Sequence, residues 1–499
     1  MAVDYLNPLG INTYQNPLQT DGQLIHGVNI SASEGLGILG KRAGYGTTLG
    51  TVSGQVNSIF DFQFQNGTQL YVYVAHGSQL HYSAQGTGAL TQASPGTINN
   101  NAYVGHVTFN GYMAIGDGNT NLWTTSDGIN FTQPGSAPVA QYLSVFHDRA
   151  YTTDGTSSNT QYSVANDITN WQNSGTSDSS FITTTQQGAN TGLFVAADRL
   201  MITKNKGNIF SWDDTSQVDL STIYGPSSPR SIAQIDDYWF YLNQFGIFGF
   251  DGATRTVLSN PIQRQFYNRQ NTGIGTAALG TAPATAHFWD YLVAVGNITD
   301  DFTGRKINNA IIKYDYQKNQ FLNWSFANAP TALCSYIDVN GQRQLLFGDA
   351  SGNLFQLDPT KTSDSGTPIS TEMVFLFNYS NQQSAFSPTS ASMVTGSNYE
   401  KKWNWLRAIF NPGCEINCQY AFSNTLTYQH LRWSEAINTR MRTGDHWQFS
   451  DGVLELRFPI DPNNLPRSRF LFVRYYEDSD NSSWQFFGQQ IDAEPQLIK

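Results

Sequence analysis

A short recurring pattern decides the fold, and it is first seen in residues 65–74, whose sequence is QNGTQLYVYV. A small polar turn containing Asn and Gly leads into a run in which apolar residues alternate. Alternation with a period of two, carried by Tyr and Val, is typical of β-strands, and clusters of Asn and Gly are typical of the turns between them. The segment therefore predicts a turn followed by a strand.

The same pattern recurs six more times along the chain. The later copies read FNGYMAIGDG (109–118), FHDRAY (146–151), ADRLMI (197–202), DDYWFYL (236–242), WDYLVAV (289–295) and NGQRQLLF (340–347). Turn residues 67, 111, 148, 198, 237, 290 and 341 anchor the copies, which lie 37 to 53 residues apart. One four-stranded blade of a β-propeller spans roughly 40–50 residues. The copies predict about seven blades, with six or eight left open; an ordinary β-sandwich, the alternative, needs no such repetition.

The composition also favours strands over helices. The chain has 499 residues, enough for more than one hydrophobic core, and only 13% of them are charged. No Lys or Arg occurs between Arg42 and Arg149, and no Glu occurs between Glu34 and Glu372. Helices normally carry these residues on their solvent faces. We therefore predict an all-β fold with helix in less than about a tenth of the residues, against a usual ~30–35%.

Changes in composition divide the chain into four parts. We expect an N-terminal extended arm over residues 1–54, with a strand near Leu24–Ile30 that could close the ring against the last blade. The β-propeller follows over 55–359, and residues 360–371 form a linker rich in small and polar residues. Residues 372–499 predict a C-terminal β-sandwich-like domain. Its expected strands are Glu372–Tyr379, Trp403–Phe410, Ile416–Phe422, Gln429–Trp433, Val453–Phe458, Phe470–Tyr476 and Trp484–Ile491, and Ser380–Glu400 is a long loop between two of them.

Aspartates in the propeller are predicted to form turns. Residues 125–131 read TSDGINF and resemble a short form of the Asp-box turn of sialidase-like propellers. The Asp127 carboxylate is expected to accept hydrogen bonds from turn amides while the aromatic residue packs beneath it. The pairs Asp154-Gly155 and Asp251-Gly252 are likewise expected to form turns. These residues therefore predict structural roles and no ligand.

We predict that the chain is not an enzyme and has no catalytic residues. Glycoside hydrolysis commonly uses two carboxylates, and a propeller site would have to build both from Asp, because no Glu lies between Glu34 and Glu372. A glycoside hydrolase is therefore the least favoured alternative. No cofactor-binding loop is recognisable.

No metal, disulfide or membrane-spanning pattern is visible either. His76 and His81 fall in one hairpin without an acidic or Cys partner at ligand spacing. Cys334, Cys414 and Cys418 cannot form a paired disulfide framework, and the last two are expected to be reduced thiols on or near one strand. Apolar runs are too short to span a membrane, and no secretory leader is visible, so we expect synthesis in the cytoplasm.

Charge is distributed unevenly. Residues 1–359 carry 15 Lys and Arg against 24 Asp and Glu, and the chain as a whole has a net charge of −11. Near the C-terminus the cluster Arg467, Arg469 and Arg474 lies beside Glu477, Asp478 and Asp480. We expect this cluster to form a solvated strand edge or a subunit contact.

The chain resembles the tail nozzle proteins of short-tailed bacteriophages, a family also described as packaged-DNA stabilisation or tail tube proteins. The resemblance rests on the arm motif KRAGY (41–45) with LGT (49–51), on the degenerate propeller, and on the terminal strands Phe470–Tyr476 and Trp484–Ile491. It implies a structural virion protein of the tail, assembled in the host cytoplasm as a homo-oligomeric ring that is commonly a hexamer. Implied partners are portal and adaptor proteins, tail fibre or needle proteins, and double-stranded DNA that passes without specific binding; no membrane is implied.

The other function left open is a receptor- or glycan-binding propeller of a tail or baseplate, which clusters of exposed Trp and Tyr on one rim would favour. If the chain forms a ring around exiting DNA, we expect an acidic or neutral-polar inner wall, because a basic wall would retain the duplex. Since neither the arm nor the Ser380–Glu400 loop has an obvious core of its own, we expect each to order against a neighbouring subunit.

Overall fold

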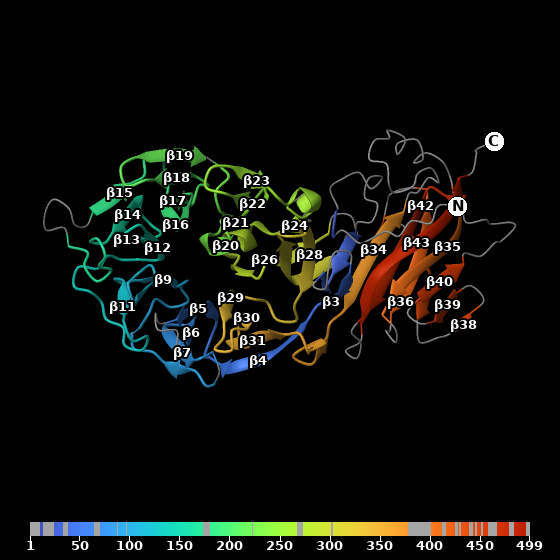
Figure 1. The fold of residues 1–499 in the computed structure, drawn as a ribbon, viewed down its shortest axis with the longest axis horizontal. Coiled ribbons are helices and arrows are strands. Elements are labelled where there is room, and N and C mark those ends of the chain that lie inside the picture. The colour runs from blue at the N-terminus through green and yellow to red at the C-terminus, as the bar shows by residue number, and fades with distance from the viewer. Residues whose placement is uncertain are drawn as a thin grey trace.

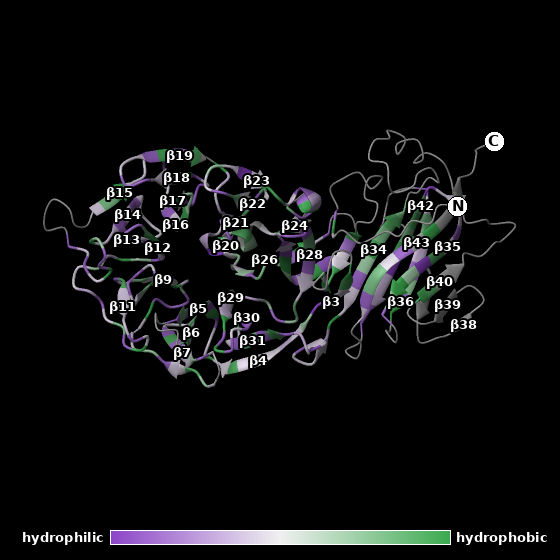
Figure 2. Cartoon of the chain, viewed as in Figure 1, coloured by the Kyte–Doolittle hydropathy of each residue, from purple (hydrophilic) through white to green (hydrophobic). Residues whose placement is uncertain are grey.

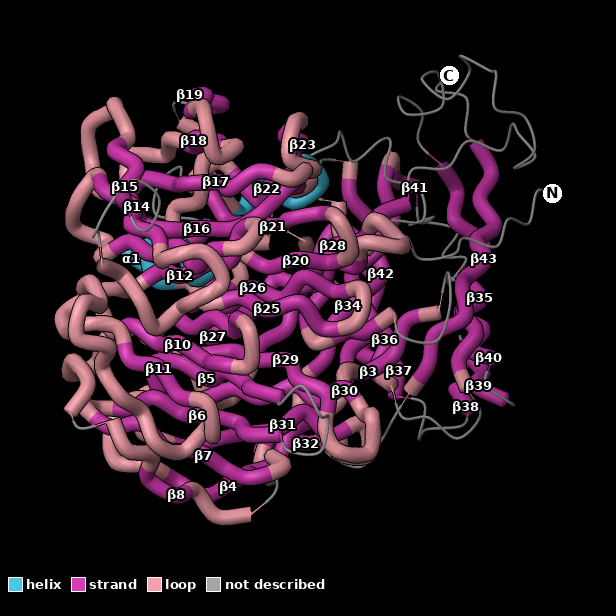
Figure 3. Tube along the Cα trace, turned by 60° about the vertical axis from the view of Figure 1, so that its left-hand side comes forward, coloured by secondary structure: helices cyan, strands magenta, loops and turns pink. Residues whose placement is uncertain are grey.

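The chain is described here by a computed structural model, in which strands dominate. The described residues are 10–12, 24–32, 38–63, 70–86, 88–95, 97–172, 180–221, 223–266, 273–300, 303–377, 401–411, 416–424, 428, 431–438, 443–444, 447–450, 453–457, 467–478 and 484–495. Strands account for 57% of the structure and helices for 4% (Figure 3). The predicted all-β propeller fold with little helix is confirmed. No helix in these ranges is long and apolar enough to cross a membrane.

The larger part of the molecule is a ring of small sheets. Within the described part of the chain, residues 44–368 form seven sheets, most of them with four strands. The first sheet contains β5 (Val56–Gln63), β6 (Leu70–His76), β7 (Gln79–Ala84) and β8 (Thr91–Gln92), and the second contains β9 (Gly105–Phe109), β10 (Tyr112–Gly116) and β11 (Trp123–Thr125). The third contains β12 (Tyr142–Phe146), β13 (Arg149–Thr153), β14 (Asn159–Tyr162) and β15 (Ser180–Thr183), and the fourth contains β16 (Asn190–Ala196), β17 (Arg199–Lys204), β18 (Ile209–Trp212) and β19 (Gln217–Ser221).

Three further sheets complete the ring. The fifth sheet contains β20 (Ala233–Ile235), β21 (Tyr238–Asn243), β22 (Gly246–Phe250) and β23 (Arg255–Val257). The sixth contains β24 (Gly273–Ile274), β25 (Ala284–His287), β26 (Asp290–Thr299), β27 (Lys306–Asp315) and β28 (Gln320–Ser325). The last contains β29 (Ala332–Ile337), β30 (Arg343–Gly348) and β31 (Asn353–Asp358), together with β4 (Gly44–Thr51), β32 (Ser363–Asp364) and β33 (Thr367–Pro368). The helices are η2 (Pro229–Ser231), η3 (Asn260–Gln265) and α1 (Thr276–Thr281). Strand β5 of the first sheet contacts both β9 of the second and β29 of the last, so the ring is closed (Figure 1).

The repeated sequence pattern marks one structural position in every sheet. Five anchor residues lie between the first and second strands of a sheet, residue 290 begins β26 directly after β25 in the sixth sheet, and residue 67 falls in 64–69, outside the described residues. The first residue of this turn has a positive φ in five sheets, at Asn110, His147, Ala197, Asp236 and Phe288. Tight hairpin turns require this left-handed backbone, which explains the frequency of Asn, Asp and Gly in the pattern.

The ring is closed by a strand from the N-terminal part of the chain, but not by the strand near Leu24–Ile30. Strand β4 pairs antiparallel with β31 and supplies the outer strand of the last sheet. Strand β1 (Leu24–Val28) instead pairs with β34 (Thr371–Phe377) in the second domain. The sequence-based expectation for this strand is therefore wrong. Four of the five β1 residues are buried, which suits a strand between two cores, whereas three of the eight β4 residues are exposed and three are half-buried, as suits an edge.

The second domain consists of two sheets and is discontinuous in sequence. One sheet has the order β1-β34-β42-β36-β37, and the other β2-β3-β43-β35-β40-β39-β38, with β41 beside β35. Besides β1 and β34, their strands are β2 (Ile30–Ser31), β3 (Leu39–Lys41), β35 (Lys401–Phe410), β36 (Asn417–Ser423), β37 (Ser434–Asn438), β38 (Thr443–Gly444), β39 (Trp447–Ser450), β40 (Val453–Arg457), β41 (Arg467–Ser468), β42 (Phe470–Glu477) and β43 (Gln485–Pro495). The propeller is thus inserted between β3 and β34. The expected separate N-terminal arm is therefore wrong, because residues 24–32 and 38–41 contribute strands to the second domain and residues 44–51 form a strand of the propeller.

Most expected C-terminal strands are confirmed. Six of them coincide with β34, β35, β36, β40, β42 and β43 to within a few residues at the ends, β43 running on to Pro495. The strand expected at Gln429–Trp433 lies instead at Ser434–Asn438, and residues 429–430 are outside the described part. The loop Ser380–Glu400 also lies outside it. The expected linker contains the short hairpin β32-β33, which contacts β4.

One hydrophobic core runs through both domains. It includes Phe240 and Tyr291 of the propeller and Phe375, Phe410 and Phe486 of the second domain, all nearly inaccessible to solvent. Figure 2 shows hydrophobic residues along strands of both domains, interleaved with polar ones. Because apolar burial contributes about 25 cal/mol per Å², the shared core holds the two domains together. The expectation that the whole arm orders against a neighbouring subunit is wrong for residues 24–32 and 38–51, which are ordered within the chain.

Replacing Tyr45, the anchor of the closing strand, is expected to destabilise the ring. The ring of Tyr45 is fully buried and lies 4.8–5.1 Å from the rings of Phe326, Phe347 and Phe355. Removing a large buried aromatic typically costs about 3–5 kcal/mol. We expect Tyr45→Ala to lower the melting temperature in scanning calorimetry far more than Tyr112→Ala, which removes an exposed tyrosine. Similar melting temperatures for the two variants would contradict the role of β4 in closure.

Candidate functional site

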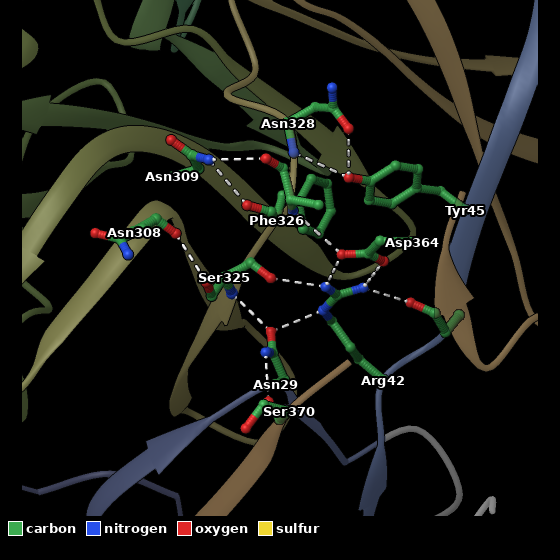
Figure 4. Close-up of polar contacts among 12 residues, drawn as sticks. Asn29, Arg42, Tyr45, Asn308, Asn309, Ser325, Phe326, Asn328, Asp364 and Ser370 are labelled. Atoms are coloured by element: carbon green, nitrogen blue, oxygen red, sulfur yellow. Dashed lines mark hydrogen bonds and ion pairs between the residues drawn. The ribbon is translucent and has the colours of Figure 1, made fainter. Parts of the chain in front are cut away.

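Arg42 lies where the chain crosses from the second domain into the propeller. Its guanidinium is completely buried and faces Asp364 at the end of the propeller (Figure 4). Nη2 and Nη1 donate to the two carboxylate oxygens at 2.6 and 2.9 Å. Nη1 and Nη2 also donate to the carbonyls of Ala43 and Ser325, and Nε donates to Oδ1 of Asn29 at 2.8 Å. All five N–H groups of the side chain are therefore satisfied, which is what a buried guanidinium requires.

Asn29 connects this cluster to the second crossing of the chain, where it passes from the propeller back into the second domain at Ser370. Its backbone is left-handed, with φ of 59°, a conformation that Asn tolerates better than most residues. The side-chain Nδ2 donates to the carbonyl of Ser370 at 2.7 Å, and Oδ1 accepts from the backbone N–H of Ser325 at 2.7 Å. We call Asn29, Arg42, Ser325, Asp364 and Ser370 the joint. It fixes the two chain crossings against the sixth sheet of the propeller.

Further ion pairs, some buried and some half-buried, lie near the joint. Lys41 binds Glu477 at 2.9 Å, with both side chains about 3% exposed. Glu372 is shared by Arg305 of the propeller and Arg474 of the second domain. His26 of β1 lies 3.1 Å from Asp300 of the propeller. These pairs correct the expectation for the C-terminal charge cluster: Arg474 and Glu477 bind partners inside the chain, Arg469 is exposed, and Asp480 is outside the described residues.

A cavity of about 780 Å³ opens beside the joint. Its lining combines residues of the last two propeller sheets, the N-terminal segment and the second domain, including Phe288, Trp324 and Trp484. It is also rich in cations, namely Lys41, Arg42, Lys313, Arg343 and Lys361, against the single acid Asp290. In a chain of net charge −11, this is a locally basic site. Its size falls in the range of small-molecule and peptide-binding pockets.

The cations of this cavity are paired to different degrees. Lys41 and Arg42 are held by Glu477 and Asp364, and Lys313 binds Asp290 at 2.6 Å. Arg343 and Lys361 take part in no ion pair among the described residues. Burial, reinforced by Arg343 and Lys313, lowers the pKa of His287 to about 4. His287 is therefore neutral at physiological pH, and the potential around it is positive.

A smaller cavity of about 270 Å³ lies between the first strands of the sheets, around the axis of the propeller. Arg230 lines it and donates to the carbonyls of Asn57 and Thr331, with its guanidinium 5.4 Å from the ring centre of Tyr103. Burial raises the pKa of Asp61 and lowers that of His106 to about 4. The same cavity exposes one face of the β29 strand that carries Cys334, whose thiol pKa is raised by burial. A thiol held in this protonated form is a poor nucleophile.

Aspartates of the propeller form turns, as the sequence predicts. Oδ1 of Asp127 accepts the backbone N–H groups of Ile129 and Asn130, both at 2.8 Å, and Phe131 is buried. Burial acts to raise the pKa of Asp127, but these bonds, with those from the side chains of Asn130 and Thr125, outweigh it and lower the pKa to about 2. Asp154 and Asp251 accept turn amides in the same way.

Two histidine contacts were not predicted. Nε2 of His76 lies 2.8 Å from Nδ1 of His81, so the two rings of the predicted hairpin pair with each other. His147 lies between Asp214 and Asp198, at 2.5 and 3.1 Å, on an exposed edge, and these bonds raise its pKa. The second cluster joins turns of neighbouring sheets that are far apart in sequence, so no local pattern reveals it. Neither cavity includes it.

Within the described ranges, no group of three His, Cys, Asp or Glu side chains is placed to hold a metal ion. Cys334 and Cys418 are buried free thiols, and Cys414 lies outside those ranges. The sequence singled out Arg42 as part of the arm motif. Its ion-pair partner Asp364 was not predicted, because nothing in the local sequence distinguishes Asp364 from the other linker residues.

These features define an all-β protein in which a β-propeller is inserted into a sandwich-like second domain. No protein-family model matches the sequence, and no curated protein sequence matches it. Among solved structures, the chain is similar to U3-55K, with a TM-score of 0.42 and 10% identity, covering 62% of this chain and 97% of that one. It is similar to the WD40 repeats of RRP9, with a TM-score of 0.42, 10% identity and coverages of 64% and 99%. It is also similar to BamB from Moraxella catarrhalis, with a TM-score of 0.38, 10% identity and coverages of 66% and 93%.

Breaking the Arg42–Asp364 pair is expected to be strongly destabilising. Arg42→Met leaves a buried carboxylate without its cation, which typically costs about 3–5 kcal/mol. Arg42→Lys should also destabilise, because an ammonium cannot reach the positions of five guanidinium donors. The double variant Arg42→Met/Asp364→Leu should melt above Arg42→Met, since it removes the unpaired charge as well. A double variant that melts lower than Arg42→Met would show that the ion pair is not the main contribution.

Removing the Asp127 carboxylate is expected to cost stability but not function. Its exposed position limits the loss for Asp127→Ala to about 1 kcal/mol. Because the folded-state pKa is depressed to about 2, the contribution is present above an unfolded-state value of about 3.9 and is lost as the pH falls through about 2. The difference in unfolding free energy between wild type and Asp127→Ala should therefore shrink below pH ~4. Unchanged melting with lost function would instead make Asp127 a functional residue.

Proposed function

We propose that the chain is a structural virion protein of a bacteriophage tail, a nozzle-like ring that continues the DNA exit channel and helps to retain or release packaged DNA. At the coarser level, the propeller provides a binding and interaction scaffold whose exposed loops and edges are available to protein partners. The ring, its hexameric state, its portal, adaptor and fibre or needle partners, and its location in the virion are parts of this proposal.

The joint is the observation that carries the proposal. The residues of the arm motif on which the family resemblance rests are the residues that lock the two domains together. Lys41 and Arg42 make buried ion pairs, and Tyr45 anchors the closing strand. Gly44 has no room for a side chain, because a Cβ would lie 2.2 Å from the carbonyl oxygen of Ser363. The motif therefore attaches the propeller rigidly to the second domain. Rigid attachment suits a structural component of a virion, which must withstand mechanical force.

The charge of the chain also supports a conduit for DNA. Residues 1–359 carry a net charge of −9, and this part includes nearly the whole propeller. An acidic or neutral-polar wall would repel phosphates weakly and let the duplex slide, whereas basic walls bind it with counterion release. Three of the five cations that line the larger cavity, Lys41, Arg42 and Lys313, are already neutralised by carboxylates of the chain.

A receptor- or glycan-binding propeller remains the second candidate, and exposed aromatic residues favour it. Tyr224 and Phe245 lie 5.7 Å apart and are both about 40% exposed, and Phe288 and Trp289 are exposed at a hairpin tip. Exposed aromatic pairs are typical of recognition surfaces. A hydrolase has no comparable support, because the carboxylates described above, apart from Asp61 in the smaller cavity, are engaged in turns and ion pairs.

Negative-stain microscopy of the purified full-length chain tests the proposed function. The nozzle predicts rings with an axial hole, formed by the chain alone or with a portal–adaptor complex of a short-tailed phage. A monomer that remains monomeric with that complex and binds immobilised glycans would overturn the nozzle and support the second candidate. As a control, the same preparation of Tyr112→Ala should assemble as the wild type does.

A further inference from the structure

One hairpin tip of the propeller departs from the repeat. The turns between first and second strands read Asn110-Gly111, His147-Asp148, Ala197-Asp198 and Asp236-Asp237 in four sheets, but Phe288-Trp289 in the sixth. Small and polar residues suit this turn, and large aromatics do not. The sequence therefore places two bulky side chains where folding alone would not select them.

The departure has a conformational cost. Phe288 has φ of 53°, in the left-handed region, where a bulky residue is disfavoured. Its side chain is 60% exposed and that of Trp289 is 40% exposed, so burial of the ring does not compensate for the strain of Phe288. Strained residues of this kind persist where the surrounding structure holds them and are concentrated at functional sites.

The tip forms a patch with the hairpin of the neighbouring sheet. The guanidinium of Arg343 lies 5.8 Å from the ring centre of Phe288, and Arg343 pairs across the ladder with Ile337. Ile337 and Val339 are 47% and 51% exposed. We call Phe288, Trp289, Ile337, Val339 and Arg343 the aromatic tip patch. Trp and Arg beside apolar side chains are the residues that supply most binding energy at protein interfaces.

Cations that make no ion pair lie beside the patch, together with the carboxylate of Asp338, which accepts the turn amides of Asn340 and Gln342. Phe288 and Arg343 also line the 780 Å³ cavity, to which Lys313 and Lys361 contribute. Neither Arg343 nor Lys361 has an ion-pair partner in the described part of the chain. Burial is the main cause of the lowered pKa of His287 beside Phe288, and Arg343 and Lys313 add to it. A partner that presents carboxylates would be attracted here, in a chain that is otherwise acidic.

We propose that the aromatic tip patch and the adjoining basic cavity bind a segment of another protein that carries acidic side chains beside large apolar ones. The apolar side chains pack on Phe288, Trp289 and the two aliphatic residues, while the carboxylates meet Arg343 and Lys361. A glycan is a poorer match, because sugars stack on aromatic rings but gain little from exposed Ile and Val. The proposal does not depend on the tail function, since it rests on the patch alone.

The test exchanges the tip for the one that the chain uses in its second sheet. Phe288→Asn/Trp289→Gly introduces the residues of the Asn110-Gly111 turn, and Asn tolerates the positive φ of position 288 better than Phe does, so the melting temperature should stay close to the wild-type value. A random-peptide display library is selected on the full-length wild-type chain and counter-selected on this variant. We expect recovered peptides to combine Asp or Glu with Phe, Trp or Leu, and to bind the variant at least about tenfold more weakly.

Two further variants separate the parts of the patch. Arg343→Gln should weaken the same peptides and reduce the salt dependence of their binding, because it removes the unpaired cation. Phe245→Asn removes an exposed aromatic elsewhere on the propeller and should leave binding unchanged. Equal binding by wild type and tip variant, recovered peptides without acidic residues, or no recovered peptides would each overturn the proposal.

Other occupants give distinct results. If a glycan array binds the wild type and not the tip variant, the patch is a sugar site and the proposal is wrong. If light scattering shows that the tip exchange dissociates wild-type oligomers, the occupant is a second copy of the chain, and the proposed separate partner is wrong.

Discussion

The buried ion pair between Arg42 and Asp364 is the interaction on which the rest of the structure depends. Taking two charges out of water costs several kcal/mol per ion, and this is offset only when every donor and acceptor finds a partner. Arg42 meets that condition with five hydrogen bonds, whose acceptors come from Asn29, Ala43, Ser325 and Asp364. These residues lie at both ends of the propeller sequence. The pair can therefore be satisfied only when the ring is closed and both chain crossings are in place.

The position of Arg42 couples ring closure to domain attachment. It follows β3, a strand of the second domain, and precedes β4, the strand that closes the propeller, by one residue. Strand β1 pairs with β34 across about 350 residues of sequence, so most of the chain must fold before the second domain is complete. Pairings of such long range make folding slow. The shared core and the ion pairs of Lys41, Glu372 and His26 then make the two domains one unit, which is why domain-level variants are better tested in the full chain.

Local patterns predicted the elements of the fold, but not how distant elements combine. The repeat of polar turn and alternating strand located the turns between first and second strands, because period and turn chemistry are properties of a few neighbouring residues. Asp127 was predicted for the same reason. The pairing partners of β1 and β4 were not predicted, because neither sequence specifies the strand that it pairs with, although β1 is the more buried of the two. The partners of Arg42, Glu477 and His147 lie tens to hundreds of residues away, where spacing along the sequence carries no information.

A repeat also makes its exceptions informative. Within one propeller, the turns between first and second strands face the same structural demand, so each tip is a control for the others. Asn, Asp, His and Ala meet the left-handed backbone at modest cost, while Phe288 meets it at a higher one and leaves an aromatic ring in solvent. Folding stability would favour Asn at this position, as it does at Asn110. The aromatic tip next to unpaired cations is therefore best explained by contacts with a partner, which the isolated chain does not make. The joint holds the neighbouring cavity in shape, so the surface is already formed before the partner binds.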